Sequence, residues 1–227
     1  MNEQQEILYL EDSTNYMDGQ KYLQFKWGLY HLEPFTSETG RPPMNAFDYV
    51  MMSETQFALG ERITETLNHI PEDFDLDHRI AKIWNAKTGK GKYQKTTIPP
   101  YLIPTLRNYL KRFSSSDQIW PINRQNAWRY YKDAGRMGGL SIFEEHENHD
   151  IEGVWTHMFR KACSKRMQEL GASRELRMLK LRHSMKDAHD AYDKKDINAL
   201  LKWEWDNLQV VNVNSSLSAN VSQRSLT

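Results

Sequence analysis

One short segment of β type, residues 79–99, constrains the fold of this chain more than any other feature. Its apolar residues indicate one strand over residues 80–84, and Thr96, Thr97 and Ile98 indicate a second, returning strand. Between the two strands, the run that starts at Lys87, Lys-Thr-Gly-Lys-Gly-Lys, is typical of a glycine-containing turn. The segment therefore predicts a β-hairpin with a lysine-rich tip, which Pro99-Pro100 closes.

Apolar residues elsewhere follow helical spacing, without βαβ alternation and without an internal repeat. The predicted helices cover residues 44–59, 62–67, 101–113, 123–137, 154–170, 174–181, 186–194 and 197–208. Gly60 separates the first two of these helices. We therefore expect a mainly α fold with a small antiparallel β-sheet or hairpin, which is an α+β class.

The length of 227 residues suits one domain or at most two. Residues 1–43 form a weakly patterned N-terminal segment, and residues 44–208 carry the patterned elements. Residues 209–227 are rich in Ser and Asn and lack periodicity, so we expect a disordered tail.

The lone cysteine, Cys163, excludes an internal disulfide framework and fits a reducing compartment. The N-terminus is acidic and polar, unlike a signal peptide, and no apolar run approaches the roughly 20 residues of a membrane span. We therefore expect no membrane partner and a cytoplasmic location, or the cytoplasm or nucleoid of a host cell.

Charge is distributed unevenly along the chain, although the formal net charge is zero. Residues 1–78 carry 4 Lys/Arg against 15 Asp/Glu, whereas residues 79–137 carry 13 against 2. A basic segment of this kind indicates a polyanionic partner such as nucleic acid. A solvated surface balanced by the acidic flank would explain the same counts.

Six residues could together cleave a phosphodiester: cations for the phosphate, proton donors and acceptors, and a hydroxyl nucleophile. In chain order they are Arg62, Lys87, His157, Arg160, His183 and Tyr192. His157 and Arg160 are three residues apart in a predicted helix, so they share one face. Each residue alone has an ordinary explanation, such as a salt bridge from Arg62 to Glu61 or Glu65. The order and spacing of the whole set favour a catalytic interpretation.

The set resembles the catalytic domain of the tyrosine recombinases, the phage-integrase family, over roughly residues 44–208. That family carries Arg, Lys, His-x-x-Arg, His and Tyr in this order. The resemblance includes Glu61-Arg62-Ile-Thr-Glu65, Lys87-Thr-Gly, Leu181-Arg-His183-Ser and the segment Ile119-Trp-Pro. It implies a tyrosine-recombinase catalytic-domain fold.

The resemblance also implies a reaction on double-stranded DNA. Tyr192 would attack the scissile phosphorus and form a 3′-phosphotyrosyl intermediate, with His157 as base or proton relay. Arg62 and Arg160 would hold the non-bridging oxygens, His183 would add a hydrogen bond, and Lys87 would protonate the leaving 5′-oxygen. The chain would act as a site-specific recombinase or integrase, as a homo-tetramer on DNA and without metal or cofactor. The residues expected to bind DNA are Lys90, Lys92, Lys95, Arg124, Arg129 and Lys132.

Some positions depart from the family pattern. Arg182 stands where the family's Leu-Gly-His box has glycine, and Lys161 where a second histidine commonly follows His-x-x-Arg. Lys90 or Lys92 could compete with Lys87 for the catalytic role. Only 61 residues precede Arg62, which leaves no room for the usual core-binding domain. The chain would be a fragment or a compact member, such as the integrase of an archaeal or viral mobile element.

Two other functions remain open on these residues: a type IB topoisomerase-like nicking-closing enzyme and a non-catalytic DNA-binding regulator. Residues 144–150, with His146 and His149 among acidic residues, could be read as a metal site, but an exposed acidic loop is favoured. The tryptophan-rich segment 197–208 could dock on a neighbouring protomer or pack on its own core.

Overall fold

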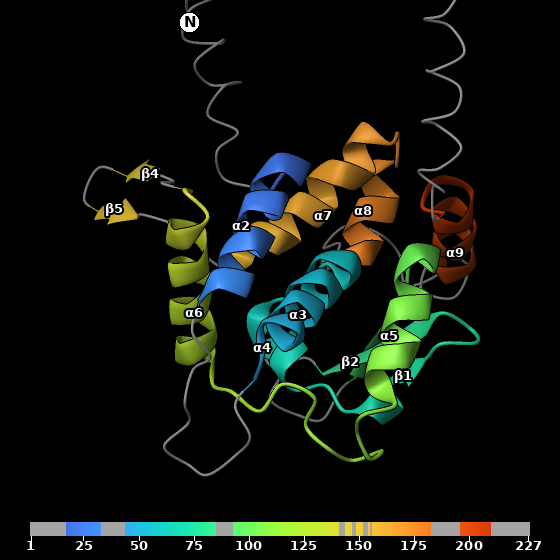
Figure 1. Ribbon diagram of the computed structural model, residues 1–227. Helices are drawn as coiled ribbons and strands as arrows, with labels where there is room; N and C mark the ends of the chain where they lie inside the picture. The colour runs from blue at the N-terminus through green and yellow to red at the C-terminus, as the bar shows by residue number, and fades with distance from the viewer. Residues whose placement is uncertain are drawn as a thin grey trace, which may run out of the picture.

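A computed structural model describes residues 17–32, 44–84, 93–140, 144–146, 149–151, 154, 156–182 and 196–209. These residues form a mainly helical fold with one three-stranded antiparallel sheet and a separate two-stranded hairpin (Figure 1). The α+β class expected from the sequence is confirmed. The elements in order are α2 (Gly19–His31), α3 (Ala46–Leu59), α4 (Ile63–Leu67), β1 (Phe74–Asp75), β2 (Ile80–Trp84), β3 (Tyr93–Thr97), α5 (Ile103–Leu110), α6 (Arg124–Met137), β4 (Glu144–His146), β5 (His149–Ile151), α7 (His157–Glu169), α8 (Arg174–Lys180) and α9 (Asp196–Asn207).

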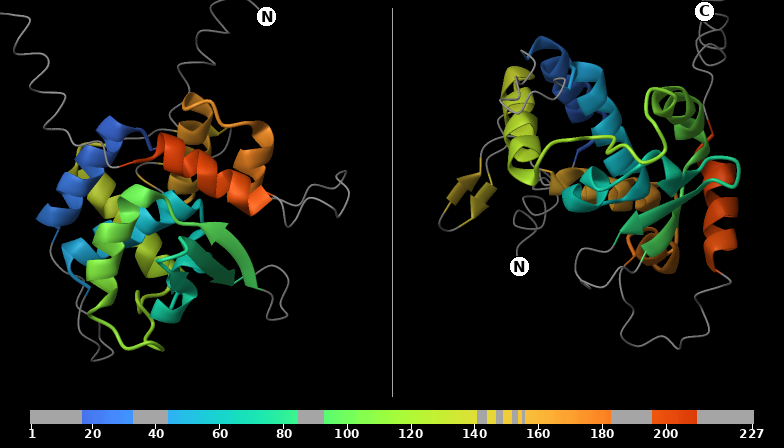
Figure 2. Two further views of the ribbon diagram at one scale, coloured as in Figure 1. Left: turned by 90° about the vertical axis from the view of Figure 1, so that its right-hand side faces the viewer. Right: turned by 90° about the horizontal axis from the view of Figure 1, so that it is seen from below.

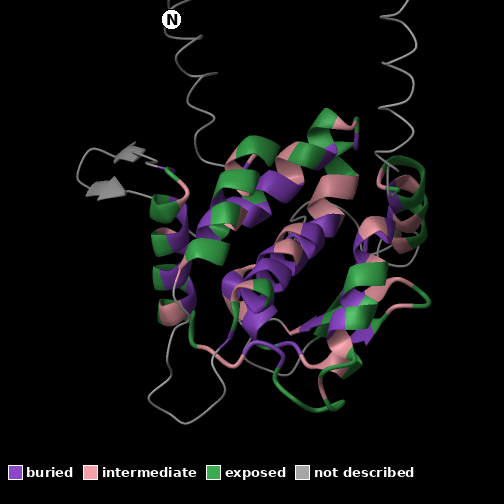
Figure 3. Ribbon diagram, viewed as in Figure 1, coloured by how far each residue is buried: buried purple, intermediate pink, exposed green. Residues whose placement is uncertain are grey.

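Helix α3 runs through the middle of the fold and is buried along most of its length (Figure 3). Its start is capped reciprocally: Asp48 N–H donates to Asn45 Oδ1 at 3.0 Å, and Asn45 N–H donates to Asp48 Oδ2 at 2.8 Å. Its end is Gly60, whose φ of 61° is in the left-handed region that glycine adopts readily. The predicted break at Gly60 is confirmed, and the chain turns there directly into α4.

The predicted hairpin is present as β2 and β3, which pair in antiparallel register from Ile80 opposite Thr97 to Trp84 opposite Tyr93. The return strand begins at Tyr93, earlier than the predicted residues 96–98, and ends at Thr97. Strand β1, which the sequence did not predict, adds to the other edge of β2. The tip of the hairpin, with Lys87, Lys90 and Lys92, lies outside the described residues.

Helix α2 is the main element that the sequence pattern missed. It buries Phe25, Gly28 and Leu29 but exposes Leu23, Trp27 and Tyr30, so apolar residues surround it and helical periodicity is weak. It packs against α6 and α3, side by side with α6 in Figures 1 and 2. The packed core therefore includes residues as early as Met17, ahead of residue 44.

Helix α9 packs on its own chain, against α8 and β3. Leu200 is buried with Cys163, Met167 and Ala172. Lys180 Nζ donates to Glu204 Oε1 at 2.6 Å and to the Thr97 carbonyl at 2.7 Å, and all of these groups are buried. The tryptophan-rich segment 197–208 therefore packs on the core of its own chain, which is one of the two arrangements expected from the sequence.

Two other sequence predictions meet the structure differently. Part of residues 144–150, expected as a loop, lies in the paired strands β4 and β5, where His146 is opposite His149, while the side chains there are not described. The predicted helix 186–194 lies outside the described residues, as does the predicted tail apart from Gln209. None of the helices described is long and apolar enough to cross a membrane.

Candidate active site

The turn from α3 into α4 presents Arg62. Arg62 is the residue before the first turn of α4, and Glu65 caps that turn because its Oε2 accepts the Arg62 N–H at 2.8 Å. The other oxygen, Glu65 Oε1, accepts from Arg62 Nη1, also at 2.8 Å. The side chain of Glu65 is buried, whereas that of Arg62 is 33% exposed. The Glu65 carboxylate thus binds both the backbone N–H and the guanidinium of Arg62, whose side chain is partly exposed to solvent.

Two further arginines converge on Glu65 from distant parts of the chain. Arg160, in the first turn of α7, places Nη1 3.9 Å from Glu65 Oε2. Arg182, which follows α8, donates from Nη2 to the same oxygen at 2.8 Å. Both side chains are only 3% exposed. The fold therefore assembles three guanidiniums around one carboxylate, an excess of two positive charges.

Backbone carbonyls fix the two buried arginines in place. Arg160 donates to the carbonyls of Gly60 and Leu181. Arg182 donates to the carbonyls of Leu59 at 2.9 Å and Lys180 at 3.0 Å. These carbonyls belong to the C-terminal ends of α3 and α8, where the helix dipole favours a cation. Arg62 is the most accessible of the three guanidiniums, and Arg160 lies buried next to it.

The ionisation of the cluster follows from this arrangement. Burial alone would raise the pKa of Glu65, but the charge of Arg182 and hydrogen bonds from Arg62 and Arg182 outweigh it and lower that pKa. Burial, and then the charges of Arg182 and Arg62, lower the pKa of Arg160 to about 10. Glu65 is therefore ionised and Arg160 protonated at neutral pH, so the positive excess persists.

The residue before His157 lies close to the residue before Arg62, although 95 residues separate Thr156 from Glu61 in the sequence. The buried amide of Gln56 donates to the Thr156 carbonyl at 2.7 Å and to the Glu61 carbonyl at 3.4 Å. One nitrogen thus holds the residue before His157 and the residue before Arg62. His157 is exposed at the first position of α7, one helical turn before Arg160. An exposed imidazole, a partly exposed guanidinium and the N-terminal end of a helix together suit a phosphate.

A buried group of three ionisable residues supports the same turn from behind. His69 pairs through Nε2 with Glu61 Oε1 at 2.7 Å and through Nδ1 with Asp73 Oδ2 at 3.2 Å. Burial opposes protonation, but the two carboxylates raise the pKa of His69 to about 9. Glu61 also accepts from Thr66 Oγ1 at 2.8 Å. The acidic neighbour that precedes Arg62 is therefore occupied by His69 and Thr66, and Arg62 pairs with Glu65.

The remaining three predicted catalytic residues, Lys87, His183 and Tyr192, lie outside the described residues, so the structure does not relate them to the cluster. The side chains of His146 and His149 are also not described. Among the residues that the structure describes, no group of three His, Cys, Asp or Glu side chains could hold a metal ion.

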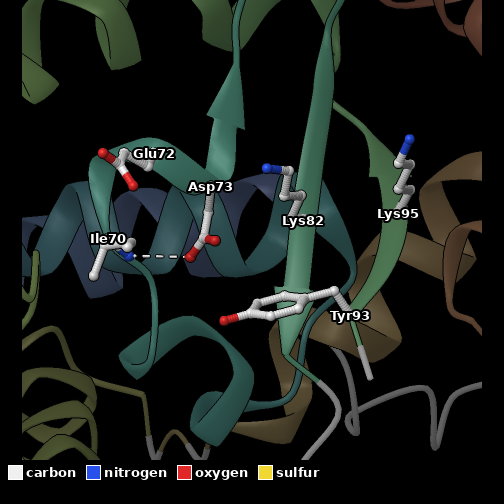
Figure 4. A pocket seen from close by; sticks show the side chains of 6 residues that line it. All are labelled: Ile70, Glu72, Asp73, Lys82, Tyr93 and Lys95. Atoms are coloured by element: carbon white, nitrogen blue, oxygen red, sulfur yellow. Dashed lines mark hydrogen bonds between the residues drawn. The ribbon is translucent and has the colours of Figure 1, made fainter. Parts of the chain in front are cut away.

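A second basic group lies on the sheet. Lys82 and Lys95 are directly opposite each other on β2 and β3, and both are exposed. With Tyr93 they form one side of a pocket of about 400 Å³, and Glu72, Asp73 and Ile70 form the other (Figure 4). Of the lysines predicted to bind DNA from the hairpin, Lys95 is the one that is described.

A third basic group lies on α6, at the other side of α3 from the sheet (Figures 1 and 2). Arg124 and Arg129 are exposed, and Lys132 Nζ lies 5.3 Å from the ring centre of the partly exposed Trp128. The three predicted DNA-binding residues of this helix are therefore available to a large partner.

Sequence reasoning missed two members of the cluster. Glu65 was considered as a salt-bridge partner of Arg62, and that pair exists, but its role as the centre of three arginines was not foreseen. Arg182 was noted only as a departure from a glycine. The burial of Arg182 cannot be predicted from the residues around it, because its partners Leu59 and Glu65 are more than 110 residues away in the sequence.

No family model matches the sequence, and no curated protein matches it. Solved structures do match. The XerH site-specific recombinase bound to difH substrate in a pre-cleavage complex has a TM-score of 0.54 at 13% identity, over 83% of this chain and 49% of XerH. Its post-cleavage complex on palindromic difH substrate has a TM-score of 0.52 at 12% identity, over 92% and 53%. The catalytic domain of bacteriophage HP1 integrase has a TM-score of 0.49 at 10% identity, over 93% and 98%. The chain spans about half the length of XerH.

Proposed function

We propose that this chain, which has the tyrosine-recombinase catalytic-domain fold, is a site-specific DNA recombinase or integrase. It would cleave and rejoin duplex DNA through a 3′-phosphotyrosyl intermediate. XerH is a site-specific recombinase seen bound to a DNA substrate, which supports DNA as the partner of this chain.

The convergence of Arg62, Arg160 and Arg182 on Glu65, with Arg160 in the first turn of α7, is the observation that carries the proposal. Phosphoryl transfer develops negative charge on the equatorial oxygens, and fixed cations stabilise it without reorganisation. Arg62 is the guanidinium that can reach a phosphate directly. Arg160 contributes its positive charge from a buried position next to Glu65. Direct contact of Arg160 with a phosphate oxygen remains a prediction.

The chemistry proposed is a displacement in two reversible steps. The Tyr192 hydroxyl attacks phosphorus, forms the phosphotyrosyl ester and expels the 5′-hydroxyl; attack by a 5′-hydroxyl then reverses the process on the same or another strand. His157 would accept the phenolic proton or relay it, because a phenol with an ordinary pKa near 10 needs help at neutral pH. Lys87 would donate a proton to the leaving 5′-oxygen, and His183 would donate a hydrogen bond to the phosphate.

The guanidiniums supply the positive charge, so we propose a reaction without metal. Strand exchange needs four active sites, so we propose a homo-tetramer on DNA.

Covalent trapping tests the proposal. Nicked duplexes that tile the DNA flanking the coding sequence are incubated with the protein in EDTA, then denatured and resolved by electrophoresis. We expect an adduct with the wild type and with the control variant Tyr93→Phe. We expect no adduct with Tyr192→Phe.

Each other outcome has a distinct meaning. An adduct that survives in Tyr192→Phe would assign the nucleophile to another residue. DNA binding without any adduct would contradict the proposal and favour a non-catalytic regulator. Relaxation of supercoiled plasmid without recombinants would favour a nicking-closing enzyme.

A further inference from the structure

Arg182 has an unusual backbone conformation for its residue type. Its φ is 53°, in the left-handed region, and Arg79, at 57°, is the other non-glycine residue with positive φ in the described chain. A non-glycine residue held there is strained, because its Cβ crowds the following carbonyl oxygen. Contacts made by the side chain must offset that strain.

The side chain of Arg182 connects three helices. Nη1 donates to the carbonyls of Leu59 and Lys180, at the ends of α3 and α8. Nη2 donates to the Gly60 carbonyl at 3.3 Å and to Glu65 Oε2, at the start of α4, at 2.8 Å. Gly60 also accepts from Arg160, so capping the end of α3 does not by itself require the reach of Arg182 to Glu65.

The contact with Glu65 has a consequence for Arg62. Glu65 Oε2 accepts from the Arg62 N–H and from Arg182 Nη2, each at 2.8 Å, which leaves Oε1 facing Arg62 Nη1. Arg182 is also the charge that contributes most to keeping the buried Glu65 ionised. A carboxylate whose Oε2 has a second donor, the Arg182 side chain, offers Arg62 a partner of fixed position, whereas one held by the Arg62 N–H alone has more freedom to rotate about its terminal bond.

We propose that Arg182 is a positioning residue that acts through Glu65 to hold the Arg62 guanidinium in one orientation toward the scissile phosphate. The orientation of Arg62 is a property of the folded chain alone. Its effect on DNA cleavage rests on the function proposed above. The two parts are therefore measured separately.

The first measurement follows the Arg62 side chain without DNA. In protein labelled with ¹⁵N-arginine, the Nε–Hε signal of Arg62 is assigned by its loss in Arg62→Lys. We expect a rigid signal in the wild type and a lower heteronuclear NOE in Arg182→Gly and Arg182→Asn, two residues that tolerate positive φ. Arg182→Lys keeps a charge beside Glu65 and should restore part of the rigidity. An Arg62 signal that stays rigid in both uncharged variants overturns the proposal.

The second measurement follows cleavage and uses a matched control. Arg79 also has positive φ and donates from Nη2 to a carbonyl, that of Leu201, at 2.9 Å, and its guanidinium lies over the Trp205 ring, so its side chain contacts α9. The variants are compared at a temperature where circular dichroism shows every one of them folded, with enough protein to saturate the DNA. We expect Arg182→Gly to form the adduct about 10- to 100-fold more slowly than the wild type. DNA affinity should stay within about twofold, because the side chain of Arg182 is buried and is therefore not expected to contact the DNA backbone. Arg79→Gly should cleave like the wild type.

The outcomes separate the two claims. Equal slowing in Arg79→Gly and Arg182→Gly, in proportion to lost stability, would reduce Arg182 to a structural cap and overturn the proposal. If the wild type forms no adduct while Arg62 becomes more mobile in the Arg182 variants, the recombinase function is contradicted. The positioning of Arg62 by Arg182 is supported by the same result.

Discussion

At the scale of single residues, the cluster around Glu65 shows why burial matters more than residue type. The same Arg62 serves as a salt-bridge partner of Glu65 and as the exposed cation of the site. The pair keeps Arg62 in place because Glu65 is itself held by Arg182. Exposed arginine–carboxylate pairs contribute little, whereas a buried carboxylate left without partners is costly. The ion pair and the proposed phosphate site are therefore one arrangement.

His69 should give the folded protein a pH-dependent stability. Its pKa in the fold is about 9, above the ordinary 6.5, because Glu61 and Asp73 outweigh burial. Its stabilisation is therefore fully present below pH 6.5 and is lost as pH rises toward 9. We expect the wild-type free energy of unfolding, measured in urea, to fall by up to about 3 kcal/mol across this window. His69→Gln should be less stable at pH 6 and lack this decline, while His78→Gln, at an exposed histidine, should keep it.

At the scale of elements, contacts between helices decide which segments belong to the core. Helix α2 lacks clear periodicity and still packs, because two glycines let its backbone approach α6. A Cβ on Gly28 would lie 1.9 Å from the Ala134 carbonyl oxygen, and one on Gly138 would lie 2.2 Å from that of Gln24. Helix α9 is held instead by a buried ion pair. Both devices are long-range and leave no local sequence pattern.

Gly28→Ala tests the α2–α6 approach. The added methyl meets rigid backbone, so the helices must separate, and we expect a loss of at least about 2 kcal/mol in the free energy of unfolding. Gly19→Ala, in the first turn of the same helix, meets nothing within 4 Å and should be neutral or slightly stabilising. Equal stability of the two variants in urea unfolding would contradict this packing.

Lys180→Met tests the anchor of α9. It leaves the buried Glu204 without its cation, and we expect a loss of about 3–5 kcal/mol, with faster hydrogen exchange in α9. Adding Glu204→Leu removes the unpaired carboxylate and should recover most of the loss. Lys202→Met, which breaks the exposed pair with Asp206 on the same helix, should change little. Unchanged exchange in Lys180→Met would show that α9 is held by its apolar contacts alone.

At the scale of the whole molecule, charge separates into an acidic N-terminal third and a basic middle segment. Two basic groups of the middle segment lie on separate elements, Lys82 and Lys95 on the sheet and Arg124, Arg129 and Lys132 on α6. The sheet and α6 lie on either side of α3 (Figures 1 and 2). A protein with this distribution can have zero net charge and still bind a polyanion, because the potential near one surface differs from the average.

Salt dependence of DNA binding tests the α6 surface. Each phosphate contact releases counterions, so Arg124→Gln, Arg129→Gln and Lys132→Gln should each reduce the slope of log affinity against log salt by about 1. Lys202→Gln, on α9 at the opposite side of the molecule, should leave the slope unchanged (Figure 1). Fluorescence anisotropy of a labelled duplex at several salt concentrations measures all four. Equal slopes in every variant would exclude α6 from the DNA interface.

The sequence by itself determined the elements whose signals are local. Gly60 ended α3, Arg62 preceded α4, and the segments on either side of the lysine-rich turn paired as β2 and β3. Turn glycines, helix caps and alternating apolar residues act within a few positions of one another, so they can be read from the chain. The order of the arginines and histidines likewise predicted the fold that the likeness to XerH shows.

Only the tertiary structure decided which charges share a site. Glu65 and Arg182 became neighbours because α3, α4, α7 and α8 meet at one point, and a buried charge requires a partner whatever its distance in sequence. The same holds for Lys180 with Glu204 and for α2 against α6. Burial and close packing depend on the whole fold, so the residues that create them carry no mark in the sequence around them.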